Sequence, residues 1–318
     1  MMASPTSIPP PRASSERLEA RGTGGVFDDD APVTPARYPG RWVAAGLVLL
    51  LAALFVRVLV TNPRFQWGVV RHYFFSSTIL TGLLLTLELT AIAMGIGIAL
   101  GIVLAVMRMS PNPIIAYASH LYVWFFRGTP LLVQLIFWYN LAALFPSIAV
   151  GIPLGPTFTH LSANSLIGTF TAAILGLSLN ESAYMSEIVR AGILSVNQGQ
   201  VDAARALGMT RLLAMRRVVL PQAMRIIVPP AGNETIGMLK MTSLVSVIAL
   251  AELLYSAQLI YASNFETIPL LIVVSLWYLL VTSVLTLAQG RVEAYFGRGR
   301  GAQRRATTTK RLLRLGGR

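Results

Sequence analysis

The sequence contains no cysteine and few charged residues. Without cysteine, the chain can form no disulfide, thiolate metal site or cysteine nucleophile. Only 12% of its 318 residues are charged and 54% are hydrophobic, whereas about 25% of the residues in an ordinary soluble domain are charged. This composition indicates a membrane protein.

Motifs for catalysis and nucleotide binding are also missing. The three histidines, His72, His120 and His160, do not have the spacing of metal ligands, and the sequence contains neither HEXXH nor Gly-x-Ser-x-Gly. It also contains no Gly-x-x-x-x-Gly-Lys-Ser/Thr phosphate loop. We therefore expect no catalytic residue, no metal and no cofactor bound by this chain, and any ATP that it depends on must be hydrolysed by a partner.

Positive charge is abundant, and its distribution distinguishes nucleic-acid binding from membrane topology. The net charge is +13, but the basic residues collect at the ends of apolar segments. Nine of the 26 Lys and Arg lie in 291–318 and six lie in 190–225, whereas 146–164 and 257–267 have none. We interpret this bias as membrane topology and expect no nucleic-acid partner.

The apolar runs are long and do not alternate, which predicts an all-α integral membrane protein. Six membrane-spanning helices are expected, and the third is short unless it extends back toward Tyr117. Their predicted ranges are 42–60, 78–107, 130–145, 166–189, 236–255 and 268–288.

The basic bias also predicts how the helices are oriented. It places 190–225 and 289–318 in the cytoplasm, so both termini are expected to be cytoplasmic in a multi-pass protein of the cytoplasmic membrane. The first helix fits this orientation least well, because Arg57 near its end and Arg64 and Arg71 after it lie on the side expected to be external. If 42–60 lies on the membrane surface instead, the core has five spans.

The two ends of the chain differ in composition from the apolar middle. The first forty residues hold seven prolines and four serines without a hydrophobic period, so 1–41 is expected to be a disordered cytoplasmic tail. Residues 290–318 form a basic cytoplasmic tail. A cleaved signal peptide is not expected, because the apolar run begins only at Trp42.

A polar stretch at 197–222 interrupts the apolar sequence. Asn197 can cap a helix that Gly208 ends in the left-handed conformation, and Thr210 can cap a second short helix that ends before Pro221. One interpretation is an amphipathic loop that rests on anionic headgroups of the membrane lipid. The other is a rigid docking element that enters a groove on a soluble partner and transmits its motion to two spans.

Several motifs in this order resemble a known family. The spacing of Asp202-Ala203-Ala204, Gly208 and Leu220-Pro221 is similar to the cytoplasmic loop of permease subunits of bacterial ATP-binding-cassette (ABC) importers. "FRGTPLLVQL" at 126–135, "SAYMSEIVRAGILSV" at 182–196 and "LPQAMRIIVPPAGNETIGMLKMTSL" at 220–244 narrow the resemblance to permeases for polar amino acids, the histidine, glutamate, glutamine, arginine and opine group.

The resemblance covers about 80–289 and implies a permease domain at 78–289 with a coupling loop at 197–222. It implies that ATPase subunits dock on this loop, that a second permease chain, identical or homologous, completes the pathway, and that an extracytoplasmic amino-acid-binding protein delivers the substrate. The family usually has Glu where this chain has Asp202, which keeps the charge and shortens its reach. The expected docking residues are Gln200, Asp202, Ala203, Ala204, Leu207 and Gly208.

Charged residues inside the predicted spans are candidates for the substrate pathway, because a charge in hydrocarbon costs at least a few kcal/mol. The candidates, within a span or at the entry to the fifth, are Glu88, Glu234, Lys240 and Glu252. Asn233, Gly237, Lys240 and Ser243 also recur at helical spacing and form a polar stripe that should line the pathway.

Glu234 and Lys240 lie roughly 120° apart around a helix, so they would flank one cavity. They could bind the ammonium and carboxylate of a zwitterion, or they could form an internal ion pair that holds helices together. The resemblance favours substrate contact by Glu234 and Lys240, with Glu88 as a weaker candidate. Thr242 and Ser243 could donate hydrogen bonds to a carboxylate, although hydroxyls in spans commonly bond back to their own helix.

Two other features are expected to be structural. Glu187 precedes Arg190 by three residues, which suits a surface ion pair. Arg127 begins a helix break that ends at Pro130.

The alternative to an importer is an ion-coupled secondary amino-acid transporter, which would use the same polar stripe. Such transporters often show an internal repeat, and no such repeat is evident in the sequence.

Overall fold

The computed structural model describes residues 39–151, 157–162 and 167–297, so most of the predicted tails, 1–38 and 298–318, lies outside the described residues. The chain divides into two units at residues 62 and 63. The described part of the first unit is helix α1 (Pro39–Thr61), whose segment Trp42–Thr61 is long and apolar enough to cross a membrane and has none of its residues buried.

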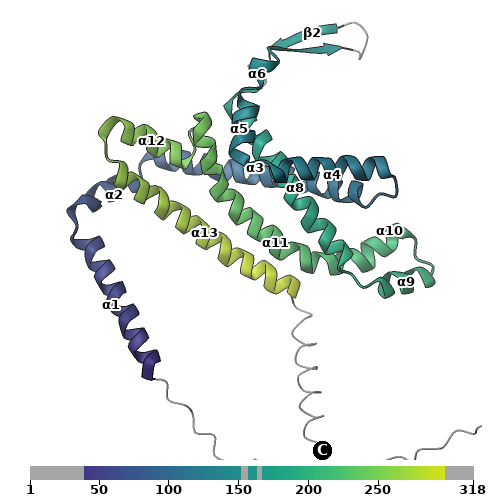
Figure 1. Ribbon diagram of the computed structural model, residues 1–318, viewed down its shortest axis with the longest axis horizontal. Helices are drawn as coiled ribbons and strands as arrows, with labels where there is room; N and C mark the ends of the chain where they lie inside the picture. Colours follow the sequence, from purple (N-terminus) through teal and green to yellow (C-terminus); the bar gives the residue numbers. More distant parts are fainter. Residues whose placement is uncertain (1–38, 152–156, 163–166, 298–318) are drawn as a thin grey trace, which may run out of the picture. The chain divides into compact units, whose positions relative to one another are not determined.

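The second unit is a helical bundle with one small β hairpin (Figure 1). Its elements are η2 (Pro63–Phe65), α2 (Trp67–Phe74), α3 (Ser77–Arg108), α4 (Pro113–Gly128), α5 (Leu131–Tyr139), α6 (Leu141–Leu144), β1 (Ser147–Gly151), β2 (Thr157–Ser162), α8 (Thr169–Leu194), α9 (Gln198–Ala206), α10 (Arg211–Ala214), η3 (Met215–Val219), α11 (Leu220–Met241), η4 (Thr242–Ile248), α12 (Leu253–Asn264) and α13 (Thr267–Gly297).

Helices α3 and α8 pack along each other through two glycines of α3. A Cβ at Gly97 would lie 2.7 Å from Cγ of Glu181, and a Cβ at Gly101 would lie 2.5 Å from Cβ of Met185. Glycines spaced by four residues place both close approaches on one helix face. Such small-residue faces let helix backbones pack closely where the hydrophobic effect drives no association.

The third predicted span, 130–145, is wrong as a single helix, because its residues form α5, which ends at Tyr139, and the short α6. Helices α4 and α5 meet at an angle of 101°, and only the two together are apolar and long enough to form a broken span. The break falls at Thr129 and Pro130, because proline has no amide hydrogen and disfavours helix at the preceding residue. The bend expected at this motif is therefore present.

The fifth predicted span, 236–255, is also wrong in its bounds. Helix α11 starts at Leu220 and is followed by the 3-10 helix η4, and Ala249 then adopts a left-handed φ of 60°. The chain turns by 45° into α12. Together these helices form a second bent pair, which by length and composition is either a broken span or a re-entrant loop, where one straight helix is predicted.

Pro221 does not end a helix, contrary to the prediction for the second short helix of the loop. Helix α10 runs through the π-helix η3 directly into α11. Pro221 lies in the first turn of α11, directly after the π-helix η3. The loop is therefore joined to α11 without an intervening coil.

By length and composition, three described helices could cross a membrane, or five if each bent pair is one span. Besides α1 and the two bent pairs, these are α3 and α13. Helix α8, which corresponds to the predicted span 166–189, is not among them, because polar residues such as Asn180 and Glu181 interrupt its apolar sequence. Its 26 residues still make it about 39 Å long, and much of it is buried in the bundle.

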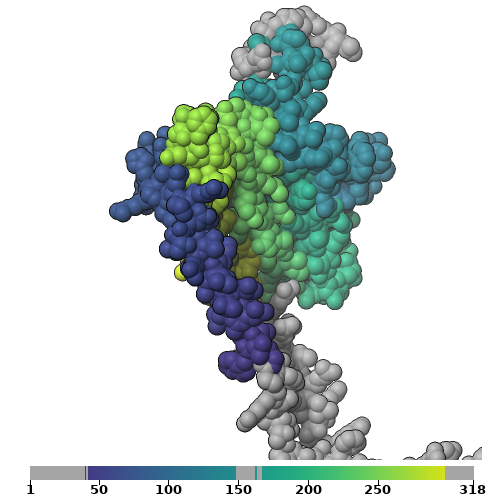
Figure 2. Space-filling model, turned by 60° about the vertical axis from the view of Figure 1, so that its left-hand side comes forward, coloured from purple at the N-terminus to yellow at the C-terminus, as the bar shows by residue number. Residues whose placement is uncertain are grey.

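Helix α13 closes one side of the bundle. It packs against α2, α11 and α12, and the space-filling view shows the start of α13 (yellow-green) beside α11 and η4 (green) (Figure 2). Trp277 donates to the carbonyl of Phe74 at 2.8 Å and stacks on its ring. Beyond α5 and α6 the antiparallel strands β1 and β2 project as a hairpin (Figure 1), a feature that the sequence analysis did not predict.

Candidate functional site

The loop at 197–222 adopts the predicted pair of capped helices. Asn197 caps α9 by accepting from the amide of Gly199 at 2.8 Å, and Thr210 caps α10 by accepting from the amide of Leu213 at 3.4 Å. Gly208 has a φ of 79°, so it ends α9 in the left-handed region where glycine is favoured. Figure 1 shows α9 and α10 together at one end of the bundle, beyond α8 and α11.

Five of the six predicted docking residues lie on the surface of this loop. Gln200, Asp202, Ala203, Leu207 and Gly208 are exposed, whereas Ala204 is buried. Ala204 therefore does not face solvent, and its helix α9 packs against α10 and η3. Leu207, three residues later, is 79% exposed.

An apolar tip and an acidic side chain therefore lie close together on this loop. Leu212 on α10 is as exposed as Leu207, at 79%. Asp202 is held by Arg205 at 3.6 Å and accepts from Nε2 of Gln198 at 3.1 Å. Exposed leucines beside a positioned carboxylate can fill a groove on a protein partner.

The predicted pathway residues lie on α3, α11 and η4. Glu88 and Lys240 are exposed, and Glu234 is half-buried. No ion pair joins Glu234 to Lys240 within the described ranges. Glu234 instead interacts electrostatically with Arg127, a residue that the sequence analysis assigned only to the bend.

The two predicted hydroxyl ligands bond to their own helix. Thr242 is fully buried and donates to the carbonyl of Leu239 at 2.7 Å. Ser243 donates to the carbonyl of Lys240 at 2.7 Å. As is common for hydroxyls in membrane spans, both side chains donate to their own helix and not to a ligand. Each hydroxyl oxygen can still accept a hydrogen bond.

Glu252 has a structural explanation. Its carboxylate caps α12 by accepting from the amides of Leu254 at 3.0 Å and Tyr255 at 2.8 Å, and it also accepts from the hydroxyl of Tyr278 at 3.1 Å. A buried carboxylate with three donors is satisfied without a ligand. We therefore do not include it in the pathway.

Glu187 belongs to a larger cluster than the predicted surface pair. It binds Arg190 at 3.0 Å, as expected, but it also binds Arg108 of α3 and lies 3.6 Å from Arg127 of α4. Arg127 also lies over the ring of Tyr184, 5.0 Å from its centroid. This cluster joins α3, α4 and α8. Arg127 is also partly exposed and interacts electrostatically with Glu234.

The break between α4 and α5 is held by buried amides. Nε2 of Gln134 donates to the carbonyls of Phe126 at 3.0 Å and Thr129 at 3.1 Å. Asn180 of α8 donates to the same Phe126 carbonyl at 2.9 Å. These bonds satisfy carbonyls that the interrupted helix leaves without donors, so they fix the position of Arg127 at the break.

Glu181 is the principal polar residue that the sequence analysis missed. It lies in the middle of α8, is only 2% exposed and has no hydrogen bond or ion pair within the described part of the chain. The signal was available, because an acid inside a predicted apolar span is costly and usually functional. It was overlooked because no motif or helical stripe drew attention to it.

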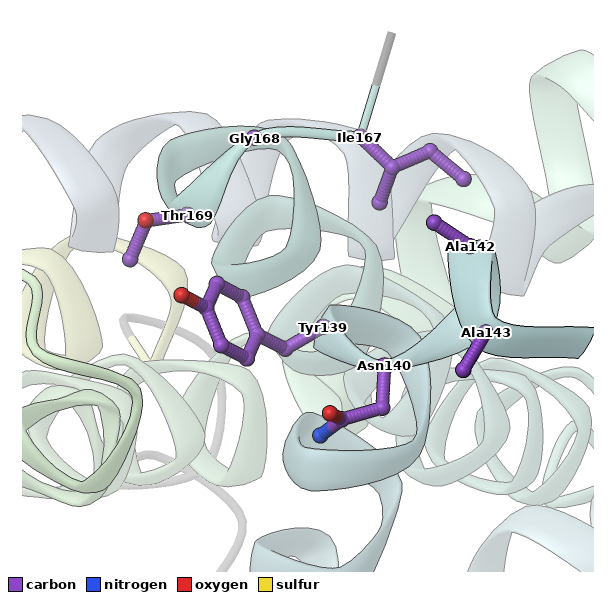
Figure 3. A pocket seen from close by; sticks show the side chains of 7 residues that line it. All are labelled: Tyr139, Asn140, Ala142, Ala143, Ile167, Gly168 and Thr169. Atoms are coloured by element: carbon purple, nitrogen blue, oxygen red, sulfur yellow. The ribbon is translucent and has the colours of Figure 1, made fainter. Parts of the chain in front are cut away.

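Two hollows of the described chain are lined by other residues. An open apolar groove of about 970 Å³ runs between α3, α8, α11 and α13. A smaller cleft of about 490 Å³ lies where α5 and α6 meet the start of α8, next to the hairpin (Figure 3). Its lining residues are Tyr139, Asn140, Ala142, Ala143, Ile167, Gly168 and Thr169. Neither hollow is lined by Glu234 or Lys240.

Comparison with known proteins identifies the family. Residues 97–296 match the model of the binding-protein-dependent transport system inner membrane component. The chain is 46% identical over 299 residues to the arginine transport system permease protein ArgU of Corynebacterium glutamicum, with 93% of this chain and 92% of that protein covered. It is 37% identical over 236 residues to the L-cystine transport system permease protein TcyB of Bacillus subtilis, with 74% and 93% covered.

A solved structure agrees with these sequence relatives. The crystal structure of an amino acid ABC transporter with histidines matches with a TM-score of 0.59 and 38% identity, covering 69% of this chain and 94% of that chain. The chain therefore belongs to the family of binding-protein-dependent transport system inner membrane components. The proteins that it resembles are transport components, and nothing in the comparisons supports the ion-coupled alternative.

Proposed function

We propose that this chain forms a translocation pathway for polar amino acids across the cytoplasmic membrane, driven by separate ATPase subunits that dock on residues 197–222. A second permease chain, identical or homologous, completes the pathway, and an extracytoplasmic binding protein delivers the amino acid. The chain itself binds no cofactor, and ATP is bound and hydrolysed by the partner. Both termini lie in the cytoplasm, where the basic segments collect.

The observation that carries this proposal is the construction of the coupling loop. Two capped helices expose Leu207, Leu212 and Asp202 at one end of the bundle. On one side α9 follows α8 closely, and on the other α10 and η3 run directly into α11. Because α11 carries Glu234 and Lys240, a partner that moves the loop would move the pathway residues with it.

In this proposal the pathway residues bind the two charged groups of a zwitterionic amino acid. Glu234 receives the α-ammonium and Lys240 the α-carboxylate. Glu88 adds negative charge, and the oxygens of Thr242 and Ser243 accept from the ligand. The electrostatic contact between Glu234 and Arg127 supports an active role for Glu234, because it connects the pathway to the ion-pair cluster around Glu187.

The test is copurification. The tagged chain is extracted from its native membranes in mild detergent, with and without residues 197–210, and its partners are identified by mass spectrometry. An ATP-binding subunit that accompanies the full chain and disappears with the deletion supports the proposal. A chain that purifies alone, even after crosslinking, contradicts it and favours an ion-coupled transporter.

A further inference from the structure

One buried face of α8 carries two polar side chains without partners. Ser178 is 1% exposed and Glu181 is 2% exposed, and they lie three residues apart, on the same side of the helix. Oγ of Ser178 and Oε1 of Glu181 have no hydrogen-bond partner within the described ranges. Buried polar atoms are nearly always paired in folded proteins, so two such atoms on one face mark a candidate site for a polar ligand.

The neighbouring helix leaves room for the Glu181 side chain. A Cβ at Gly97 of α3 would lie 2.7 Å from Cγ and 2.9 Å from Cβ of Glu181, and 3.6 Å from the carbonyl oxygen of Ser178. Any larger residue at position 97 would therefore displace the carboxyl group. The glycine lets a glutamate side chain lie between α3 and α8, where apolar packing alone would use a shorter side chain.

A second carboxyl group lies close by on α11. Glu181 and Glu234 interact electrostatically with each other, and no Lys or Arg forms an ion pair with either in the described part of the chain. Neighbouring carboxylates disfavour each other's charged form unless a cation lies between them. No group of three His, Asp or Glu suited to a metal ion occurs among the described residues, so an organic cation fits better than a metal.

The numbers of charges indicate what kind of amino acid this arrangement suits. A zwitterion needs one anionic and one cationic partner, which Glu234 and Lys240 supply in the proposed function. Glu181 adds a second, buried carboxylate with no cation of its own. A substrate with an additional positive charge at the end of its side chain would balance this carboxylate and repay part of the cost of burying it.

We propose that Glu181, with Ser178 as a second acceptor, forms the subsite for the cationic end of the transported amino acid's side chain, a guanidinium or an ammonium group. This inference rests on the proposed function and adds its substrate class. Glu234 lies next to the subsite and binds the α-ammonium of the same molecule. Gly97 is a positioning residue, since its missing side chain lets Glu181 reach this place.

The test compares arginine with citrulline, which has the same shape but a neutral ureido group. Binding of each labelled amino acid is measured on the complex of the permease with its ATPase in lipid nanodiscs, without the binding protein, so that only the membrane site discriminates. Glu181→Gln should weaken arginine binding by about tenfold or more and leave citrulline binding unchanged. Gly97→Ala should produce the same selective loss by displacing the carboxyl group.

Two controls match these changes. Glu293→Gln removes the same charge from a residue near the end of α13, and Gly95→Ala adds a methyl group where no atom lies within 4 Å. Neither should change the ratio of arginine to citrulline binding. Unchanged arginine binding in Glu181→Gln, or an equal loss of both ligands, overturns the subsite.

The wild-type complex separates this inference from the proposed function. If, with its binding protein present, it transports neutral or acidic amino acids but neither arginine nor lysine, the importer function stands and the cationic subsite is refuted. If it transports no amino acid at all, the proposed function itself fails and the subsite fails with it.

Discussion

Gly101 of α3 lies directly against Met185 of α8, where a Cβ at position 101 would approach Cβ of Met185 to 2.5 Å. The same added carbon would lie 3.1 Å from both the carbonyl oxygen of Ser182 and the amide nitrogen of Ser186. Two of these three contacts are with backbone, which cannot move aside as a flexible side chain can. The separation of the two helices therefore depends on this glycine.

We expect Gly101→Ala to destabilise the bundle by about 1–3 kcal/mol, because the added methyl group forces α3 and α8 apart. The matched control is Gly95→Ala on the same helix, where no atom lies within 4 Å and alanine should stabilise by about 1 kcal/mol. Thermal unfolding of both variants in detergent measures the difference. An equal midpoint for the two would contradict the close approach.

The sequence predicted the helix ends of the coupling loop well, because capping and helix termination depend on residues close together in the chain. The cap residues Asn197 and Thr210 and the terminator Gly208 act within a few residues, so their spacing alone places the helix ends. The loop positions were also supported by a family resemblance that the comparisons confirm. Local signals could not predict which face of α9 packs: Ala204 is buried, whereas Leu207 is exposed.

The broken spans and the buried carboxylate show where sequence reasoning failed. Hydropathy counts apolar residues and does not detect a bend, so 236–255 was read as one helix although Ala249 adopts a left-handed φ of 60°. Glu181 and Arg127 acquire their surroundings from α3, α8 and α11, elements far apart in the sequence. Such relationships become visible only after tertiary packing is known.

Gly208 ends α9 in a conformation that a β-branched residue adopts only with strain, so Gly208→Val should distort the coupling loop at a cost of about 1–3 kcal/mol. We expect the variant to insert into the membrane normally and to retain less of the ATPase on copurification. Gly208→Asn is the control, because asparagine tolerates the left-handed region and should retain the partner. Undiminished ATPase recovery with Gly208→Val would remove the support for docking at this turn.

Gln134 is buried and donates across the break between α4 and α5, to the carbonyls of Phe126 and Thr129. Gln134→Leu removes these donors and should cost about 1–3 kcal/mol, because the Thr129 carbonyl loses its side-chain donor and the Phe126 carbonyl keeps only Asn180. Asn140→Leu serves as the control, since that exposed amide donates only within its own turn, to the carbonyl of Ile136. Thermal midpoints of the two variants test this, and a midpoint for Gln134→Leu that matches wild type would show that the break does not need the amide.

Lys240 is exposed on α11, has no ion pair among the described residues and lies within the polar stripe assigned to the pathway. Lys240→Met shortens the side chain by one atom and removes its charge, so amino-acid uptake by the reconstituted complex should fall about tenfold or more if the ammonium group binds the α-carboxylate. ATPase copurification should be unchanged, because the coupling loop is untouched. Lys240→Arg retains the charge and should preserve part of the uptake. A Lys240→Met complex that transports at the wild-type rate would exclude Lys240 from the pathway and leave Arg127, the cation that interacts with Glu234, as the candidate for binding the carboxylate.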